Sequence, residues 1–162
     1  MLRFFLISSH YRSPLNYSDE GLKEAKNSLD RLYNSLEGLQ CLDKNFDKSK
    51  YSEKFHNAMQ DDFNTPSAIS ILFDLVRQIN AYKKKNDTEK ANSLASELVQ
   101  LSGILGILQN SFEDYFTTGA SLTNAEIENF IVKRNQARAN KDFALSDKIR
   151  DELLEKGISL ED

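Results

Sequence analysis

The sequence has few of the residues that define several large protein classes. It contains one cysteine, two histidines, two prolines and no tryptophan among its 162 residues. Cys41 has no partner for an internal disulfide, so we expect a reducing compartment, the cytoplasm. Together with His10 and His56, far apart in the chain, it forms no recognisable zinc-binding pattern. No apolar run approaches the roughly 20 residues that a membrane span needs, so no membrane partner is expected.

Sequence signatures of catalysis are also missing. Neither a GxxxxGK phosphate-binding loop nor a Gly-x-Ser-x-Gly elbow occurs. Glu53 and His56 have the Glu-x-x-His spacing of carboxylate-bridged di-iron bundles, but such sites need a second copy and none exists. Asp61 and Asp62 are a possible acid–base pair, yet their position just before a helix favours a role at its N-terminus. We therefore expect neither a catalytic residue nor a metal site in this chain.

The residues that are present predict an all-α fold. Apolar residues recur at helical spacing from Leu22 to Leu36, after an N-cap at Ser18. Further helices are predicted over 51–60, 65–82, 91–105, 123–140 and 142–157, with loops over 39–50 and 110–122, the second of which contains a possible turn at Ser111–Phe116. Their predicted start signals are a Thr65–Pro66 cap, a capping box at 123–126 and a cap at Asp142, and Gly157 closes the last helix. This order predicts a helical bundle followed by a C-terminal helical hairpin.

The chain begins with an apolar segment, Met1–Ile7. It is too short for the core of a signal peptide, and no small-residue cleavage site follows it. We expect it to pack against another part of the fold, and its position predicts that the chain is cut from a longer polypeptide. The same segment is compatible with a freestanding helical adaptor that docks a protein partner.

The C-terminal hairpin carries the clearest functional signal. The whole chain has a formal net charge of −4, so any attraction to nucleic acid must be local. Residues 131–150 contain six basic side chains against two acidic ones, whereas residues 151–162 contain one against five. The basic side chains are Lys133, Arg134, Arg138, Lys141, Lys148 and Arg150. Arg134, Arg138 and Lys141 recur at steps of four and three, which predicts one basic helix face.

An aromatic ring accompanies these cations. Leu145, Ile149 and Leu153 are expected to form the buried stripe of the last helix, and Phe143 falls roughly opposite, near Asp147. A ring to stack on, arginines for phosphates and a carboxylate for exocyclic amines are what unstacked RNA bases require. In the alternative interpretation, Phe143 pairs with Leu154 and packs on the preceding helix, and the charged hairpin is simply solvated.

Three segments resemble cysteinyl-tRNA synthetases in register over nearly the whole chain. Residues 10–18, HYRSPLNYS, are similar to the segment that follows the catalytic domain in that family. Residues 59–66, MQDDFNTP, resemble its helical-domain signature, with Gln60 where an acidic residue is frequent. The stretch from Arg134 through Asp147 to GISLED at 157–162 is similar to its anticodon-binding end.

The resemblance implies the C-terminal portion of a class I synthetase, which activates cysteine with ATP and charges tRNA(Cys). It implies a stem-contacting region over 1–38, a bundle of the DALR type over 48–117 and an anticodon-binding hairpin over 123–162. Family contacts to the anticodon map onto Arg138, Phe143, Asp147 and Asp162, and we add the basic Arg134 and Lys141 as tRNA-binding residues. ATP, Mg²⁺ and Zn²⁺ would be held by the catalytic domain upstream, which this chain lacks.

The sequence departs from the family pattern at two points, and one further alternative for its function stays open. Phe143 stands where tryptophan is common, which implies stacking on a smaller ring, and the family continues past Asp162 into a short segment absent here. We therefore expect weaker tRNA binding than in the whole enzyme. A relative that joins cysteine to a small amine instead of tRNA is the further alternative, but such relatives lack much of the anticodon-binding tail.

Overall fold

The fold is described from a computed structural model, which covers residues 1–41, 49–117, 124–155 and 158. These residues form eight helices and no strand, which confirms the all-α prediction. The chain divides into two compact units, Met1–Phe112 and Glu113–Asp162, and each is described by itself. The finer division into 1–38, 48–117 and 123–162 stays a prediction.

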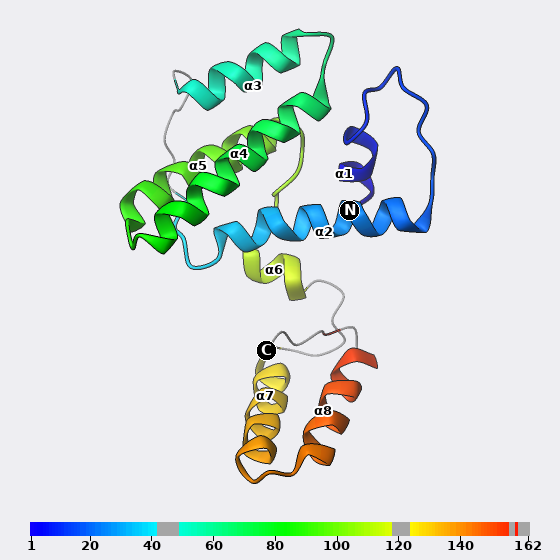
Figure 1. The fold of residues 1–162 in the computed structure, drawn as a ribbon, viewed down its shortest axis with the longest axis vertical. Helices are drawn as coiled ribbons and strands as arrows, with labels where there is room; N and C mark the ends of the chain where they lie inside the picture. Colours follow the sequence, from blue (N-terminus) through cyan, green and yellow to red (C-terminus); the bar gives the residue numbers. More distant parts are fainter. Residues whose placement is uncertain (42–48, 118–123, 156–157, 159–162) are drawn as a thin grey trace. The chain divides into compact units, whose positions relative to one another are not determined.

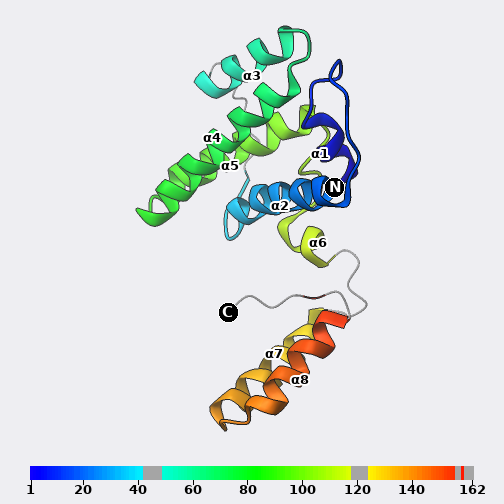
Figure 2. The ribbon, with the colours of Figure 1, turned by 45° about the vertical axis from the view of Figure 1, so that its right-hand side comes forward.

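The first unit is a layered arrangement of helices. Its helices are α1 (Leu2–Ile7), α2 (Asp19–Leu36), α3 (Lys50–Gln60), α4 (Thr65–Lys84) and α5 (Thr88–Ile104). The antiparallel pair α4 and α5 lies side by side in both views, α3 packs along α4, and α1 packs on α2 (Figures 1 and 2). The short helix α6 (Phe112–Thr117) begins at the boundary between the units.

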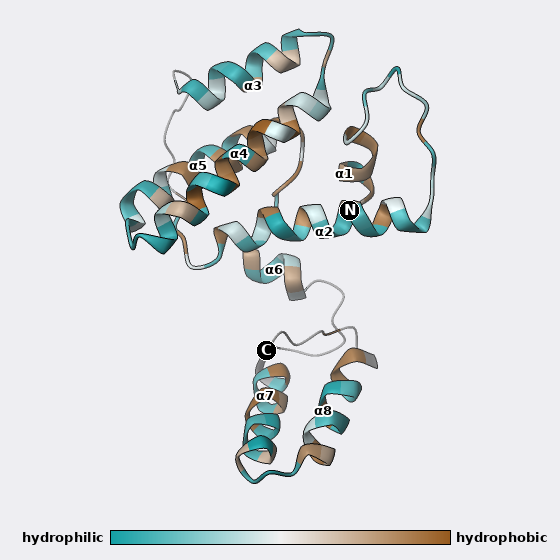
Figure 3. Ribbon diagram, in the orientation of Figure 1, coloured by the Kyte–Doolittle hydropathy of each residue, from teal (hydrophilic) through white to brown (hydrophobic). Residues whose placement is uncertain are grey.

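The core of this unit is built from the apolar stripes that the spacing predicts. Leu72 and Ile79 of α4 are completely buried, as are Leu32 of α2, Phe55 of α3 and Leu98 of α5. Apolar residues accordingly gather where α4 and α5 face each other (Figure 3). Burying one such leucine side chain contributes about 1.5–3 kcal/mol, so this stripe is the main source of stability in the unit.

The apolar N-terminal segment packs as expected. Phe4 and Phe5 of α1 are buried, at 3% and 7% exposure. Arg3 adds a polar tie, since its Nη1 donates a hydrogen bond of 2.6 Å to the carbonyl of Gly106. A Cβ at residue 106 would lie 2.4 Å from that Nη1, so the end of the arginine would have to shift, and the φ of +67° at Gly106 itself favours glycine.

The helix starts follow the predicted capping chemistry, with one correction. Ser18 caps α2 as expected, its Oγ accepting from the backbone N–H of Gly21. The cap of α4 is not Thr65 but Asn64, whose Oδ1 accepts from the N–H of Ser67 at 3.2 Å. Asparagine outranks threonine as a cap, and Pro66 then falls in the first turn, where a missing N–H costs nothing.

The second unit contains a helical hairpin, α7 (Asn124–Ala139) and α8 (Phe143–Glu155). The loop predicted over 110–122 is wrong in part, because α6 occupies 112–117, while residues 118–122 lie outside the described part of the chain. Thr123 and Gly157, expected as helix signals, also lie outside it. Across the ranges that the structure covers, no helix combines the length and apolarity needed to cross a bilayer.

Candidate nucleic-acid interface

The turn between α7 and α8 holds the candidate site in a defined geometry. The N–H of Lys141 donates to the carbonyl of Arg138 at 3.0 Å, and that of Asp142 to the carbonyl of Ala137 at 2.9 Å. This pair of bonds is the Schellman closure of a helix, with Lys141 in the left-handed conformation at φ 60°. The carboxylate of Asp142 then accepts from the N–H of Leu145 at 3.1 Å, which confirms the predicted cap of α8.

The two helices meet along a narrow face. Ala137 of α7 and Ile149 and Leu153 of α8 are buried, and so is the small polar Ser146. The predicted stripe is therefore wrong at its first member, because Leu145 is 45% exposed. Two helices bury only the strip between them, and Ser146, one position further along, lies in that strip instead.

Phe143 is displayed rather than packed. Its side chain is 63% exposed at the first position of α8. Leu154, its partner in the alternative interpretation, is 61% exposed, so neither residue is packed away. The structure therefore contradicts the packing alternative and leaves an accessible aromatic ring beside the turn.

The three predicted cations do not line one helix face. Arg138 is exposed in the last turn of α7, and Arg134, one turn earlier, is half-buried. Lys141 lies beyond the end of α7, because the helix closes at Ala139 and the chain turns. The turn thus brings Arg138, exposed Lys141 and Phe143 to one end of the hairpin, which the helical spacing alone does not predict.

The carboxylate of Asp147 lies against an arginine. An oxygen of Asp147 is 3.5 Å from Nη1 of Arg150, and Nη2 of that guanidinium is 3.3 Å from Asp151. These side chains are all more than half exposed, so the pairs contribute little to stability and can exchange for another ligand. Asp162, the remaining predicted contact, lies outside the described residues.

A groove beside this site was missed by sequence reasoning. It has a volume of about 350 Å³, and its lining includes Phe130, Gln136 and Asn140 of the α7 region together with Asp142. Lys133 Nζ lies 5.9 Å from the centroid of the Phe130 ring, within the range of a cation–π contact. Gln136 and Asn140 are four residues apart, a spacing that places both amides on one face and that the sequence already contains.

A second missed cluster lies in the first unit. Tyr11 Oη donates to Asp62 Oδ1 at 2.7 Å, the guanidinium of Arg12 lies 3.1 Å from Asp62 Oδ2, and His10 Nε2 lies 4.0 Å from it. Asp62 therefore joins the two motifs at 10–18 and 59–66. Asn64, and not Asp62, caps α4, and the carboxylate of Asp62 binds a distant segment instead.

Glu53 and His56 are joined by no third candidate metal ligand among the described residues. His56 is exposed, and its Nδ1 lies 2.8 Å from the carbonyl of Ser52, one turn earlier in α3. Across the part of the chain that the structure describes, no three histidine, cysteine, aspartate or glutamate side chains converge.

Comparison with known proteins adds the family. Residues 54–109 match the model of the DALR domain. Over its full length the chain is 48% identical to the cysteine–tRNA ligase of Hahella chejuensis and 49% identical to that of Methylococcus capsulatus. Over 99% of the chain, identity to the cysteine–tRNA ligase of Pectobacterium carotovorum is 47%. The chain is a homologue of the C-terminal portion of cysteine–tRNA ligase. It spans 35–36% of the length of these ligases.

Proposed function

We propose that this chain is the tRNA-recognition portion of a cysteine–tRNA ligase and contributes no catalytic residue. In that enzyme, cysteine is activated with ATP and transferred to tRNA(Cys) by a preceding catalytic domain, which would hold ATP, Mg²⁺ and Zn²⁺. The described residues do not offer ligands for such a zinc ion, because no three candidate side chains converge. We place the enzyme in the cytoplasm, an assignment supported by the single free thiol, Cys41.

The observation that carries the tRNA assignment is the exposed ring of Phe143 at the basic end of the hairpin. An aromatic residue at 63% exposure gains little burial from folding, whereas it offers a stacking surface for an unpaired base. Arg138 and Lys141 lie at the same end and would neutralise phosphates. Asp147 would accept hydrogen bonds from base amino groups, with Asp162 and Arg134 as further contacts.

Binding to labelled tRNA(Cys), followed by fluorescence anisotropy, tests this proposal. Affinity should fall steeply with salt, and a tRNA with an unrelated anticodon should bind more weakly. Phe143→Ala and Arg138→Ala should each cost on the order of 1–3 kcal/mol of binding free energy. Leu154→Ala, which removes an equally exposed apolar side chain of α8, is the matched control and should bind as the parent does. Equal binding of both tRNAs would contradict the assignment of the site.

The freestanding-adaptor alternative receives less support. Its motivation is the apolar N-terminal segment, but Phe4 and Phe5 of that segment are buried inside the first unit. The match to cysteine–tRNA ligases also extends over the entire chain, including the hairpin. A ligase that uses a small amine acceptor would have no use for that hairpin.

A further inference from the structure

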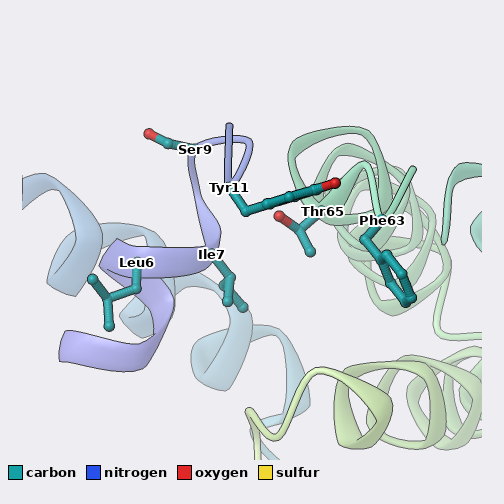
Figure 4. Close-up of a pocket in the computed structure, with 6 residues that line it drawn as sticks. All are labelled: Leu6, Ile7, Ser9, Tyr11, Phe63 and Thr65. Carbon is teal, nitrogen blue, oxygen red and sulfur yellow. The ribbon is translucent and has the colours of Figure 1, made fainter. Parts of the chain in front are cut away.

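An apolar pocket lies in the first unit, away from the hairpin. It has a volume of about 370 Å³ and is lined by Leu6, Ile7, Ser9, Tyr11, Phe63 and Thr65. Ile7 comes from α1, and Tyr11 reaches from the following segment toward Thr65 and Phe63 at the start of α4 (Figure 4). Only a serine, a threonine and the tyrosine hydroxyl bring polar atoms to it, so it suits an apolar occupant.

Hydrogen bonds and an ion pair at the edge of the pocket fix the position of Tyr11. Asp62 accepts the hydroxyl of Tyr11 at 2.7 Å and lies 3.1 Å from the guanidinium of Arg12, whose Nε in turn donates to the Tyr11 hydroxyl at 2.9 Å. The bond to Asp62 raises the pKa of Tyr11 further above neutral pH, where the phenol is already protonated and able to donate. Tyr11 is thereby fixed as one wall of the pocket.

The opposite wall is held at a conformational cost. Asp62 and Phe63 are consecutive residues in the left-handed region, at φ 52° and 50°. For a bulky side chain such as phenylalanine this backbone conformation is unfavourable. The result is that Phe63 is 65% exposed, so the cost is not repaid by burial within this chain. Strained residues of this kind cluster at functional sites, which makes Phe63 a candidate contact residue.

The apolar surface continues from the pocket along α1. Leu2 and Leu6 are one helical turn apart and are 54% and 52% exposed, and Met1 is 53% exposed. Apolar side chains that gather on one face, unlike isolated ones, are typical of an interaction surface.

The length of the relatives identifies the occupant. The cysteine–tRNA ligases that match this chain have roughly two thirds of their sequence outside the matched portion. Since the match is to their C-terminal portion, most of that sequence precedes it. We infer that the pocket and the exposed face of α1 receive apolar side chains of the preceding catalytic part of the ligase. This inference rests on the proposed function and adds the surface through which the two parts join.

The test compares the chain alone with a fusion in which the preceding part of the Hahella chejuensis ligase is joined at Met1. Hydrogen–deuterium exchange of residues 1–11 and 60–66 should slow at least tenfold in the fusion. Phe63→Asn removes the ring while keeping a residue that tolerates positive φ, so the melting temperature of the chain alone should not fall. In the fusion it should fall, whereas Ile104→Gln, at another exposed apolar site in the first unit, should have no such selective effect.

Unchanged exchange at both segments, or an equal effect of Phe63→Asn in the chain alone and in the fusion, would overturn the inference. Association of the chain alone that is abolished by Phe63→Asn in analytical ultracentrifugation would overturn it too, since a second copy would then be the occupant. These readouts use no tRNA. Failure of the proposed function would appear separately, as loss of anticodon discrimination in a fusion whose two segments are protected.

Discussion

Two helical hairpins, α4–α5 and α7–α8, are closed by the same turn but use different residues in it. In the first, the N–H groups of Asn86 and Asp87 donate to the carbonyls of Lys83 and Tyr82, at 3.0 Å each. The second repeats this pattern at 141 and 142, and in both turns the following aspartate caps the next helix. The left-handed residue, however, is asparagine in one turn and lysine in the other.

The two turns differ in the conformational cost of their left-handed residue. Asparagine adopts the left-handed conformation readily, and the same closure at the end of α5 uses Gly106, at φ 67°. Lysine is disfavoured there by about 1 kcal/mol. On the proposed function, the cation kept at that cost next to the exposed Phe143 would contact tRNA, whereas the first turn would only close a hairpin.

The hairpins also differ in how completely they bury their apolar residues, and this gives the largest expected effect. Leu72→Ala in α4 removes a fully buried side chain and should lower the free energy of unfolding by about 2–5 kcal/mol. Leu145→Ala in α8 removes one that is 45% exposed and should cost well under half as much. Urea unfolding followed by circular dichroism measures both. Similar losses would show that the hairpin buries Leu145 in solution.

Exchanging the left-handed residues sharpens the comparison at the turns. Lys141→Asn should raise the free energy of unfolding by about 1 kcal/mol and lower the slope of log affinity for tRNA(Cys) against log salt by about one. Asn86→Lys, the mirror change, should destabilise by a similar amount and leave the salt slope unchanged. Thermal melts and anisotropy titrations at several salt concentrations are required. An unchanged salt slope in Lys141→Asn would remove Lys141 from the interface.

The two hairpins also show which structural features the sequence predicts and which it does not. The α4 stripe and the cap at Asp142 follow from spacing and local hydrogen bonding, which a short stretch of sequence contains in full. The burial predicted for Leu145 is wrong, because helical spacing identifies an apolar stripe but not how many neighbouring side chains cover it. Lys141 was placed on a helix because lysine carries no signal for a left-handed turn.

Contacts between distant segments were harder still. Asp62 lies 51 residues from Tyr11, and the pattern around each residue is locally complete without the other. Both motifs were recognisable, yet nothing in either specifies that the carboxylate of one binds the hydroxyl of the other. Arg138, Phe143 and Asp147, by contrast, lie within ten residues of one another, so their proximity follows from the sequence, while their role in tRNA binding stays a prediction.

A buried acid in the α4–α5 hairpin gives the smallest expected effect. Glu97 of α5 is 3% exposed and accepts a hydrogen bond from Ser49, the cap of α3. Burial, the larger influence, raises the pKa of Glu97, and the bond from Ser49 lowers it. The folded state therefore binds this proton more tightly than the unfolded chain, whose glutamates titrate near 4.3. The stability from this group is complete below about pH 4.3 and is lost as pH rises through the higher pKa of the fold.

Glu97→Gln stays neutral and keeps an oxygen that accepts from Ser49, so it should not lose stability in this way. Its stability relative to the parent should therefore rise between pH 4 and pH 7.5, as measured by urea unfolding at the two values. Glu24→Gln, at an exposed position of α2, is the control and should show a smaller change. If the two variants respond to pH alike, burial does not control the proton of Glu97. The difference between the α4–α5 hairpin and the α7–α8 hairpin would then be supported only by the leucine variants and by the exchange of Asn86 and Lys141.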